Sequence, residues 1–267
     1  MTRVLITGAA GGIGRVLRAG LKGRYPVLRL GDVAPLGEAG PGEELVHVDI
    51  RDPLALDAAM TGIDAVVHLA GIAEEDRWER IRDINIDGTF QVFDAARRAG
   101  VGRVVFASSN HAVGFYRRAR PLDERVMVRP DTRYGVSKAF GEALGRLYAD
   151  KHGLSVACLR IGSFRARPQG YRQLITWLSH ADMVELARCC IEAPAYHFVV
   201  LYGISNNARA KWWSADARRV GYVPRDDAEA FAAEILAAGE AEPALAAAFH
   251  GGPYCPMEFS GDPDRIE

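Results

Sequence analysis

Short hydrophobic segments alternate with segments of helical period along the N-terminal part of the chain. A continuous apolar run such as Val104–Ala107 is typical of a strand that helices cover on both faces. These runs predict strands at Arg3–Thr7, Val27–Asp32, Leu45–Asp49, Ala65–Ala70, Arg103–Ser108, Ser155–Ile161 and His197–Tyr202. The intervening periodicity predicts helices at Ile13–Gly23, Pro53–Met60, Trp78–Ala99 and Tyr134–His152. This alternation indicates an α/β fold built on a doubly wound parallel sheet.

The pattern changes after residue 162. The stretch Gly162–Gly170 is rich in Arg, Gly and Pro and predicts a loop. Helical patterns follow at Gln173–Trp177, Ala181–Glu192, Ala210–Val220 and Ala228–Ala238. We therefore predict a sheet domain over 1–162 and a small C-terminal cap with a tail over 163–267, in which His197–Tyr202 rejoins the sheet. The tail 251–267 is expected to be irregular and to cross the parent domain or reach a neighbouring subunit.

Composition excludes several classes of partner. The chain has 33 Lys and Arg against 34 Asp and Glu, a net charge of −1, and no basic block. Nucleic acid is therefore not an expected partner. No apolar stretch approaches the length of a membrane span, which is about 18 residues, so no membrane association is expected. The four cysteines match no metal-site spacing, so we expect reduced thiols in the cytoplasm and no metal.

A glycine-rich turn follows the first predicted strand. Its three spaced glycines are Gly8, Gly11 and Gly14, and Gly12 and Ile13 lie between the last two. Small residues at a strand-to-helix turn let a pyrophosphate approach the backbone, and the helix N-terminus then faces the phosphates. The turn predicts a dinucleotide site.

Other strand ends fit the same site. Asp32 closes the second strand, where a carboxylate accepts hydrogen bonds from the ribose hydroxyls and repels a 2′-phosphate. We therefore expect NAD instead of NADP. The ends of parallel strands also provide the remaining candidates for cofactor contacts, which are Asp49, Ile50, Leu69, Ala70, Gly71 and Ile161.

Tyr134 and Lys138 are separated by one turn of a predicted helix. An ammonium beside a phenol favours its ionised form, which would make the Tyr a base at neutral pH. Ser109, at a strand end, offers a hydroxyl to the reacting oxygen. Asn85 interrupts an apolar helical stretch, where its amide either holds a water beside the Lys or is simply a satisfied buried amide.

In order and spacing, these residues resemble the short-chain dehydrogenase/reductases, particularly the extended branch that includes nucleotide-sugar epimerases. The resemblance covers most of residues 1–205. It implies a Rossmann-type domain in which Tyr134 is the catalytic base, Lys138 orients the nicotinamide ribose and lowers the Tyr pKa, and Ser109 aligns the substrate hydroxyl.

A narrower resemblance is to the bacterial uronate dehydrogenases, carried by the strings Phe106–His111, Arg160–Ser163, Tyr171–Arg172 and Thr176–His180. It implies oxidation of the C1 hydroxyl of D-glucuronate or D-galacturonate by NAD to the aldarolactone, in a homo-oligomer. A carboxylate matches the donor fork of an Arg, and ring hydroxyls need neutral polar groups. The substrate candidates are Arg172, Ser163, Asn110, His111, Ser109 and Tyr134, with Ala73 where the family typically has a serine.

Two other functions remain open from the residues alone. A nucleotide-sugar epimerase or dehydratase shares the fold and the Tyr and Lys pair, although only about a hundred residues follow the sheet domain to hold a nucleotide. A non-catalytic NAD-sensing protein shares the cofactor site but has no need of a base, so Tyr134, Lys138 and Ser109 argue against it.

Overall fold

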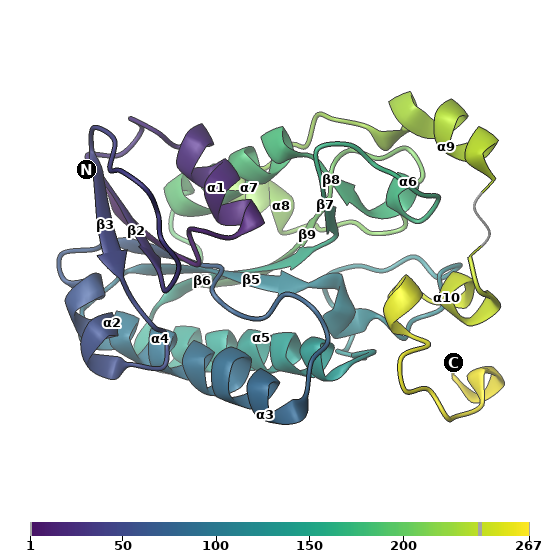
Figure 1. Cartoon of the computed structure of the whole chain (residues 1–267), viewed down its shortest axis with the longest axis horizontal. Helices are drawn as coiled ribbons and strands as arrows, with labels where there is room; N and C mark the ends of the chain where they lie inside the picture. The colour runs from purple at the N-terminus through teal and green to yellow at the C-terminus, as the bar shows by residue number, and fades with distance from the viewer. Residues whose placement is uncertain (1, 240–241, 267) are drawn as a thin grey trace.

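A parallel sheet forms the centre of the molecule (Figure 1). The computed structural model describes residues 2–239 and 242–266. Within them, seven strands pair in the order β3-β2-β1-β4-β5-β6-β9, every neighbouring pair parallel. Their bounds are β1 Arg3–Thr7, β2 Val27–Asp32, β3 Glu43–His47, β4 Ala65–His68, β5 Arg103–Ser109, β6 Ser155–Ile161 and β9 Phe198–Gly203. β9 pairs with β6, which confirms that the chain returns to the sheet after the predicted cap loop.

Helices cover both faces of the sheet, as Figure 1 shows. One face carries α1 (Gly12–Gly20), α7 (His180–Glu192) and α8 (Ala217–Val220). The other carries α2 (Pro53–Met60), α3 (Trp78–Arg80), α4 (Gly88–Arg98) and α5 (Arg133–His152). Successive strand side chains point to opposite faces, so on β1 Val4 and Ile6 enter one core and Leu5 the other. This double burial explains why the strands are continuously apolar in sequence.

Local sequence chemistry sets where the helices begin and end. The Asp52 carboxylate accepts from the Leu54 and Ala55 N–H groups at the start of α2, and Pro53 occupies the first turn. Thr132 caps α5 by accepting from the Gly135 N–H at 3.0 Å. Gly153 ends α5 with φ of 74°, a conformation that glycine adopts without strain. The long helix that carries Tyr134 is thus fixed at both ends by its own sequence.

The C-terminal part packs on the sheet domain as a set of short elements. Gly162–Gly170, predicted to be loop throughout, contains the short strand Ser163–Phe164 (β7), which pairs with Trp177–Leu178 (β8). The other elements are α6 Gln173–Thr176, α9 Ala232–Ala238, α10 Ala244–Ala248 and the 3₁₀ turns Ala228–Phe231, Gly252–Tyr254 and Pro263–Arg265. The described tail returns to the parent domain, where the Gly251 N–H donates to the Gly114 carbonyl at 2.9 Å. The domain boundary at residue 162 stays a prediction.

Several predicted boundaries are wrong for identifiable reasons. β3 begins and ends two residues earlier than the pattern indicates, because it pairs in register with β2 from Glu43 onward. β4 ends at His68, before the predicted Ala70. The expected helix over 210–220 forms only as α8, because Leu122 exchanges backbone hydrogen bonds with Lys211 and Trp213 and so holds that segment in a β-bridge.

The predicted helix Trp78–Ala99 is interrupted by a π-helical segment, Ile81–Asp87, between α3 and α4. A π turn inserts an extra residue into a helix and is frequent at functional sites.

Among the described residues, no helix combines the length and apolar character that crossing a membrane requires.

Candidate functional site

Two adjoining cavities lie beside the glycine turn and the ends of the central strands. Their volumes are about 580 Å³ and about 450 Å³. They share a boundary formed by Gly8, Gly11, Leu69, Gly71 and Ile72. The larger, which we call the sugar-side cavity, contains Tyr134, and the smaller, which we call the adenosine-side cavity, contains Asp32. The arrangement spans the point where strand order reverses between β1 and β4, where open α/β sheets bind ligands.

The glycine turn is packed so tightly that Gly8 and Gly14 cannot carry side chains. Gly8 has φ of 76°, and a Cβ there would lie 2.6 Å from the Ala70 backbone nitrogen. A Cβ on Gly14 would lie 2.5 Å from the Gly8 carbonyl oxygen. Gly12 has open space around its Cβ position, and no side chain caps the N-terminus of α1. The turn therefore presents bare backbone and the positive end of a helix to the cavities, as a pyrophosphate requires.

The adenosine-side cavity holds the predicted strand-end residues. Asp32 accepts from the backbone N–H groups of Ala10 and Ala34, both at 2.9 Å, so its carboxylate is fixed at the cavity wall. Asp49 also lines this cavity, and its hydrogen bond with the Arg51 side chain lowers the pKa of the carboxyl. Ile50 and Ala70 complete the predicted set on this side.

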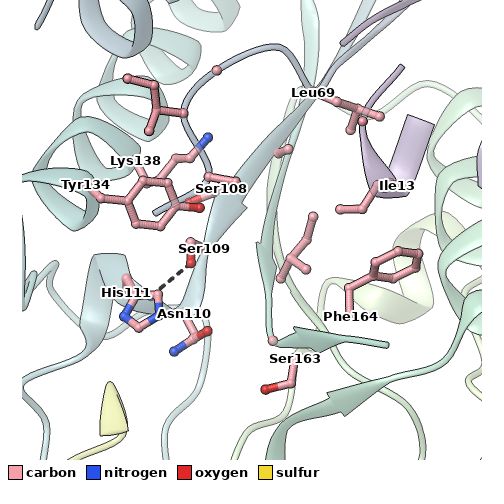
Figure 2. A pocket seen from close by; sticks show the side chains of 18 of the residues that line it. Ile13, Leu69, Ser108, Ser109, Asn110, His111, Tyr134, Lys138, Ser163 and Phe164 are labelled. Atoms are coloured by element: carbon pink, nitrogen blue, oxygen red, sulfur yellow. Dashed lines mark hydrogen bonds between the residues drawn. The ribbon is translucent and has the colours of Figure 1, made fainter. Parts of the chain in front are cut away.

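Tyr134, Lys138 and Ser109 meet on one wall of the sugar-side cavity. Figure 2 shows the Tyr134 ring beside Lys138, with its hydroxyl turned toward the end of β5 at Ser108 and Ser109. The Lys138 ammonium lies 5.4 Å from the centre of the Tyr134 ring and 5.2 Å from that of Phe106. These three of the four predicted catalytic side chains are buried and line the same cavity, so the structure brings them together.

Burial dominates the electrostatics of this wall. It raises the pKa of Tyr134 above its ordinary value, and the hydrogen bond with the Ser109 hydroxyl opposes this effect. The lowered Tyr pKa expected from the neighbouring ammonium is therefore not present in this structure. Burial also lowers the pKa of Lys138 to about 8, because its charged form is poorly solvated.

Arg172 closes the opposite part of the sugar-side cavity. Its Nε and Nη2 donate to the His250 carbonyl at 3.1 and 2.9 Å, and its Nη1 lies 3.4 Å from the Ser163 hydroxyl. With the Asn110 amide turned to satisfy both neighbours, its oxygen accepts from Arg172 at 2.8 Å and its nitrogen donates to the Ile161 carbonyl. Burial lowers the pKa of Arg172 to about 10, and the nearby Arg118 contributes. No carboxylate of the described chain forms an ion pair with Arg172.

His111 lies between Tyr134 and the C-terminal tail. Its ring stacks on Tyr254 with centroids 4.0 Å apart and meets the Tyr134 ring edge-on at 5.9 Å. Its Nδ1 lies 2.7 Å from a carboxylate oxygen of Asp131. Ser109 accepts from the His111 backbone N–H at 3.2 Å, the contact drawn in Figure 2. The histidine is therefore held on several sides while it lines the cavity.

Asn85 is placed differently from the water-holding hypothesis. Its amide oxygen accepts from the Ile72 N–H at 2.7 Å, and its nitrogen donates to the Ile72 carbonyl and the Ser137 hydroxyl. It lines neither of the two cavities. The π-helical segment turns this amide toward the loop after β4, so Asn85 holds the cavity wall at Ile72 through the backbone.

Sequence reasoning missed several lining residues of the sugar-side cavity. They come from the cap and the tail: Phe164, Arg165, Gln173, Pro253 and Tyr254. Phe164 lies on the same side as Ile13 and Leu69 in Figure 2, facing Tyr134. The predicted Gly12, Ile13, Ile161 and Ala73 also line it, with Ala73 exposed at the rim. No local pattern marks Pro253 and Tyr254, because only the folded tail brings them to the site.

The described residues contain no group of three or more His, Cys, Asp or Glu side chains arranged to hold a metal ion. Their four cysteines are buried free thiols.

Comparisons with known proteins point to one family. The model of the NAD dependent epimerase/dehydratase family matches residues 4–185. A uronate dehydrogenase of Pseudomonas putida is 44% identical over 246 residues, covering 92% of this chain and 90% of that protein. An NAD-dependent glucose-6-phosphate dehydrogenase of Haloferax volcanii is 41% identical over 254 residues, covering 86% of this chain and 96% of its own length.

Solved structures agree with the sequence comparison. The crystal structure of uronate dehydrogenase from Agrobacterium tumefaciens has a TM-score of 0.91 and 42% identity, and the match covers 96% of this chain and 97% of that one. A mutant of that enzyme has been solved complexed with NAD, at the same TM-score of 0.91.

Proposed function

The chain belongs to the NAD dependent epimerase/dehydratase family, and from that premise we propose that it is an NAD-dependent uronate dehydrogenase. The reaction is oxidation of the C1 hydroxyl of D-glucuronate or D-galacturonate to the aldarolactone. One observation carries the choice of substrate: Arg172 lines the cavity that contains Tyr134 and Ser109, and no carboxylate of the described chain pairs with it. A substrate that brings its own carboxylate supplies the missing partner.

The residues around the glycine turn fit NAD. Bare backbone at Gly8, Gly11 and Gly12 and the uncapped N-terminus of α1 suit the pyrophosphate. The Asp32 carboxylate, fixed by two backbone donors, suits a ribose with free hydroxyls and repels a 2′-phosphate. Leu69 and Gly71 lie at the boundary of the two cavities and Ile161 lies on the sugar side. The adenosine-side cavity is also lined by Asp49, Ile50 and Ala70. When bound, NAD supplies the acceptor for the hydride that leaves C1.

The protein's part in the chemistry is proton removal and orientation. Tyr134 takes the proton of the C1 hydroxyl, and Ser109 holds that hydroxyl by a hydrogen bond. Lys138 orients the nicotinamide ribose, and its charge stabilises the phenolate that Tyr134 must form. Because burial raises the Tyr134 pKa, positive charge near the phenol is needed for activity at neutral pH. Asn85 supports this wall through Ile72 and Ser137.

The remaining polar residues of the cavity bind the sugar through its carboxylate and its ring hydroxyls. Arg172 binds the carboxylate at the end of the substrate remote from C1, and its donors are already oriented by His250, Ser163 and Asn110. Ser163, Asn110 and His111 provide neutral groups for ring hydroxyls. The Ala73 side chain, at the rim, has no hydroxyl where the family typically has a serine. The sugar therefore has one side-chain hydrogen bond fewer at this position.

A substrate panel tests the proposal. The purified protein is incubated with NAD and glucuronate, galacturonate, neutral aldoses, glucose 6-phosphate or UDP-sugars, and NADH absorbance is followed. We expect steady NADH formation with the uronates and a slower reaction with NADP. Epimer formation from a UDP-sugar without net NADH would replace the proposal by a nucleotide-sugar epimerase. Oxidation of glucose 6-phosphate in preference to the uronates would reassign the anion that Arg172 binds.

A third outcome addresses the sensing alternative. Binding of NAD without turnover of any sugar in the panel would reduce the protein to a cofactor-binding role. Binding of NAD is followed in the same samples by calorimetry, so the two results are separated.

Self-association in a cytoplasmic setting is part of the same proposal. Phe90, Val136 and Leu147 expose apolar side chains on α4 and α5, which supports a homo-oligomer. The four free cysteines support a reducing compartment. Light scattering of the purified protein measures the subunit number, and a monomer at working concentration would remove this part of the proposal.

A further inference from the structure

Asp131 is a buried carboxylate that adjoins the sugar-side cavity and has no part in the chemistry described above. Its side chain is fully buried. One oxygen accepts from the Thr132 hydroxyl at 2.9 Å, and the other lies 2.7 Å from His111 Nδ1. The Cys255 thiol lies 3.9 Å from that second oxygen. Both oxygens therefore face donors, and the carboxylate lies between the start of α5, the His111 turn and the tail.

The surrounding chain is shaped to admit this carboxylate. A Cβ on Gly114 would lie 1.9 Å from the Asp131 Oδ2 atom, and a Cβ on Gly251 would lie 1.8 Å from it. Any larger residue at either position would occupy the place of the carboxylate. The backbone of Gly251 is in turn hydrogen-bonded to Gly114 at 2.9 Å. Two glycines from distant parts of the sequence thus enclose the contact between Asp131 and His111.

We propose that Asp131 is a positioning residue that fixes the tautomer of His111. An ionised carboxylate only accepts hydrogen bonds, so the His111 Nδ1 facing it must carry the proton. In the neutral imidazole, Nε2 is then left as an acceptor. Within the described chain Nε2 has no hydrogen-bond partner, and the His111 side chain lines the sugar-side cavity. His111 therefore accepts from a hydroxyl of the bound sugar and does not donate to one.

A fixed tautomer makes His111 selective for sugar hydroxyls that donate a hydrogen bond. Arg172 provides only donors and Ser163 provides both kinds of group, so an obligate acceptor at His111 complements them. A sugar hydroxyl that donates to Nε2 retains its oxygen for other contacts. This role in sugar recognition rests on the proposed function, whereas the tautomer itself does not.

Nitrogen-15 NMR of the full-length protein labelled at histidine tests the tautomer directly. The spectra are recorded above the ordinary histidine pKa of about 6.5, and His111→Gln identifies the His111 signals. We expect a protonated Nδ1 and an unprotonated Nε2 in the wild type. An Nε2–H tautomer, or protonation of both nitrogens, would overturn the proposal, and this measurement needs no variant of Asp131 and no activity.

Asp131→Asn then tests the cause. The new amide offers an N–H to Nδ1, so we expect a shift of the His111 signals toward the Nε2–H tautomer. We also expect KM for glucuronate to rise by about five- to tenfold, the loss typical of one hydrogen bond between neutral groups, while KM for NAD changes less than twofold. Unchanged His111 signals and an unchanged KM in a folded variant would refute the assignment.

A matched control lies on α5, the helix that begins just after Asp131. Asp150 pairs with His197 Nε2 at 2.6 Å on the protein surface, away from both cavities. Asp150→Asn should alter only the His197 signals and leave the kinetic constants at wild-type values. Addition of glucuronate with NADH, which cannot turn over, should move the His111 Nε2 signal. If the substrate panel fails but the tautomer is as expected, the function is wrong and the role of Asp131 stands.

Discussion

The Lys138 ammonium lies 5.4 Å from the centre of the Tyr134 ring, one turn further along α5, and both side chains are buried. The phenol and the ammonium therefore lie in a poorly solvated wall of the cavity, where burial disfavours the charged form of each group. Burial raises the pKa of Tyr134 and lowers that of Lys138.

Tyr134→Phe should abolish NADH formation from uronates, because the variant has no hydroxyl to accept the C1 proton. General-base catalysis typically contributes about 10² to 10⁴ in rate, so kcat should fall by at least a factor of about a hundred. Binding of NAD, measured by calorimetry, should change little because the ring remains in place. Retained turnover would remove Tyr134 from the role of base.

Lys138→Met should stabilise the folded protein at neutral pH while it destroys activity. The folded pKa of Lys138, about 8, lies below its ordinary value of 10.5. The folded state therefore binds fewer protons than the unfolded state between these values, and stability gains from rising pH. Burial of this charge costs the wild type on the order of 3 kcal/mol at neutral pH, and the cost disappears as the pH rises from about 8 to above 10.5.

The measurement is urea denaturation of wild type and variant at neutral and alkaline pH. The difference in unfolding free energy should be largest at neutral pH and should shrink through the window between the two pKa values. A difference that does not depend on pH would show that Lys138 is not destabilised by burial.

Arg172→Ala should mainly raise KM for uronates. Hydrogen bonds to charged groups contribute about 1.5 to 3 kcal/mol, so we expect a rise of roughly 10- to 150-fold with a smaller effect on KM for NAD. Arg172→Lys should recover part of the affinity, because it keeps the charge but loses the donor fork. The partly exposed Arg209, which pairs with Glu229, provides a control, and Arg209→Ala should leave both KM values unchanged. Unchanged uronate kinetics in Arg172→Ala would place the substrate carboxylate elsewhere.

Local sequence chemistry was sufficient to predict the sheet domain and the cofactor turn. Strands β1, β2 and β6 have the predicted bounds. Burial on both faces requires apolar residues along a strand, so the apolar runs and the glycines beside them show where each strand lies. The turn is recognisable in the sequence from Gly8, Gly11 and Gly14, because a side chain at each of these positions would crowd neighbouring backbone atoms. Most predicted site residues line the two cavities because they follow the carboxyl ends of parallel strands, where ligands bind in open α/β sheets.

The rest depends on contacts between distant segments. Tyr254 enters the sugar-side cavity only because the tail folds back onto His111. The segment around Trp212 has helical periodicity, yet stacking of Trp212 on Tyr202 at 5.4 Å and pairing with Leu122 hold it extended. The sequence marks Asn85 as a polar residue in an apolar stretch, but the π-helical turn that directs its amide to Ile72 has no signature in the sequence. Tertiary contacts overrode local propensity in each case.

Glu142→Gln should strongly destabilise the fold, because it leaves a buried guanidinium without its counter-charge. Glu142 and Arg160 form two hydrogen bonds of 2.9 Å with both side chains buried, and Ser108 donates to the same carboxylate at 2.6 Å. Removing one partner of a buried ion pair typically costs about 3 to 5 kcal/mol, which urea denaturation should detect. Glu229→Gln, in the surface pair with Arg209, should change the unfolding free energy much less than Glu142→Gln does, because solvent screens that pair. The double variant Glu142→Leu with Arg160→Met should recover much of the loss, because no charge remains buried. Equal losses for the single and double variants would show that shape and packing, not the unpaired charge, set the cost at this position beside the catalytic strand end.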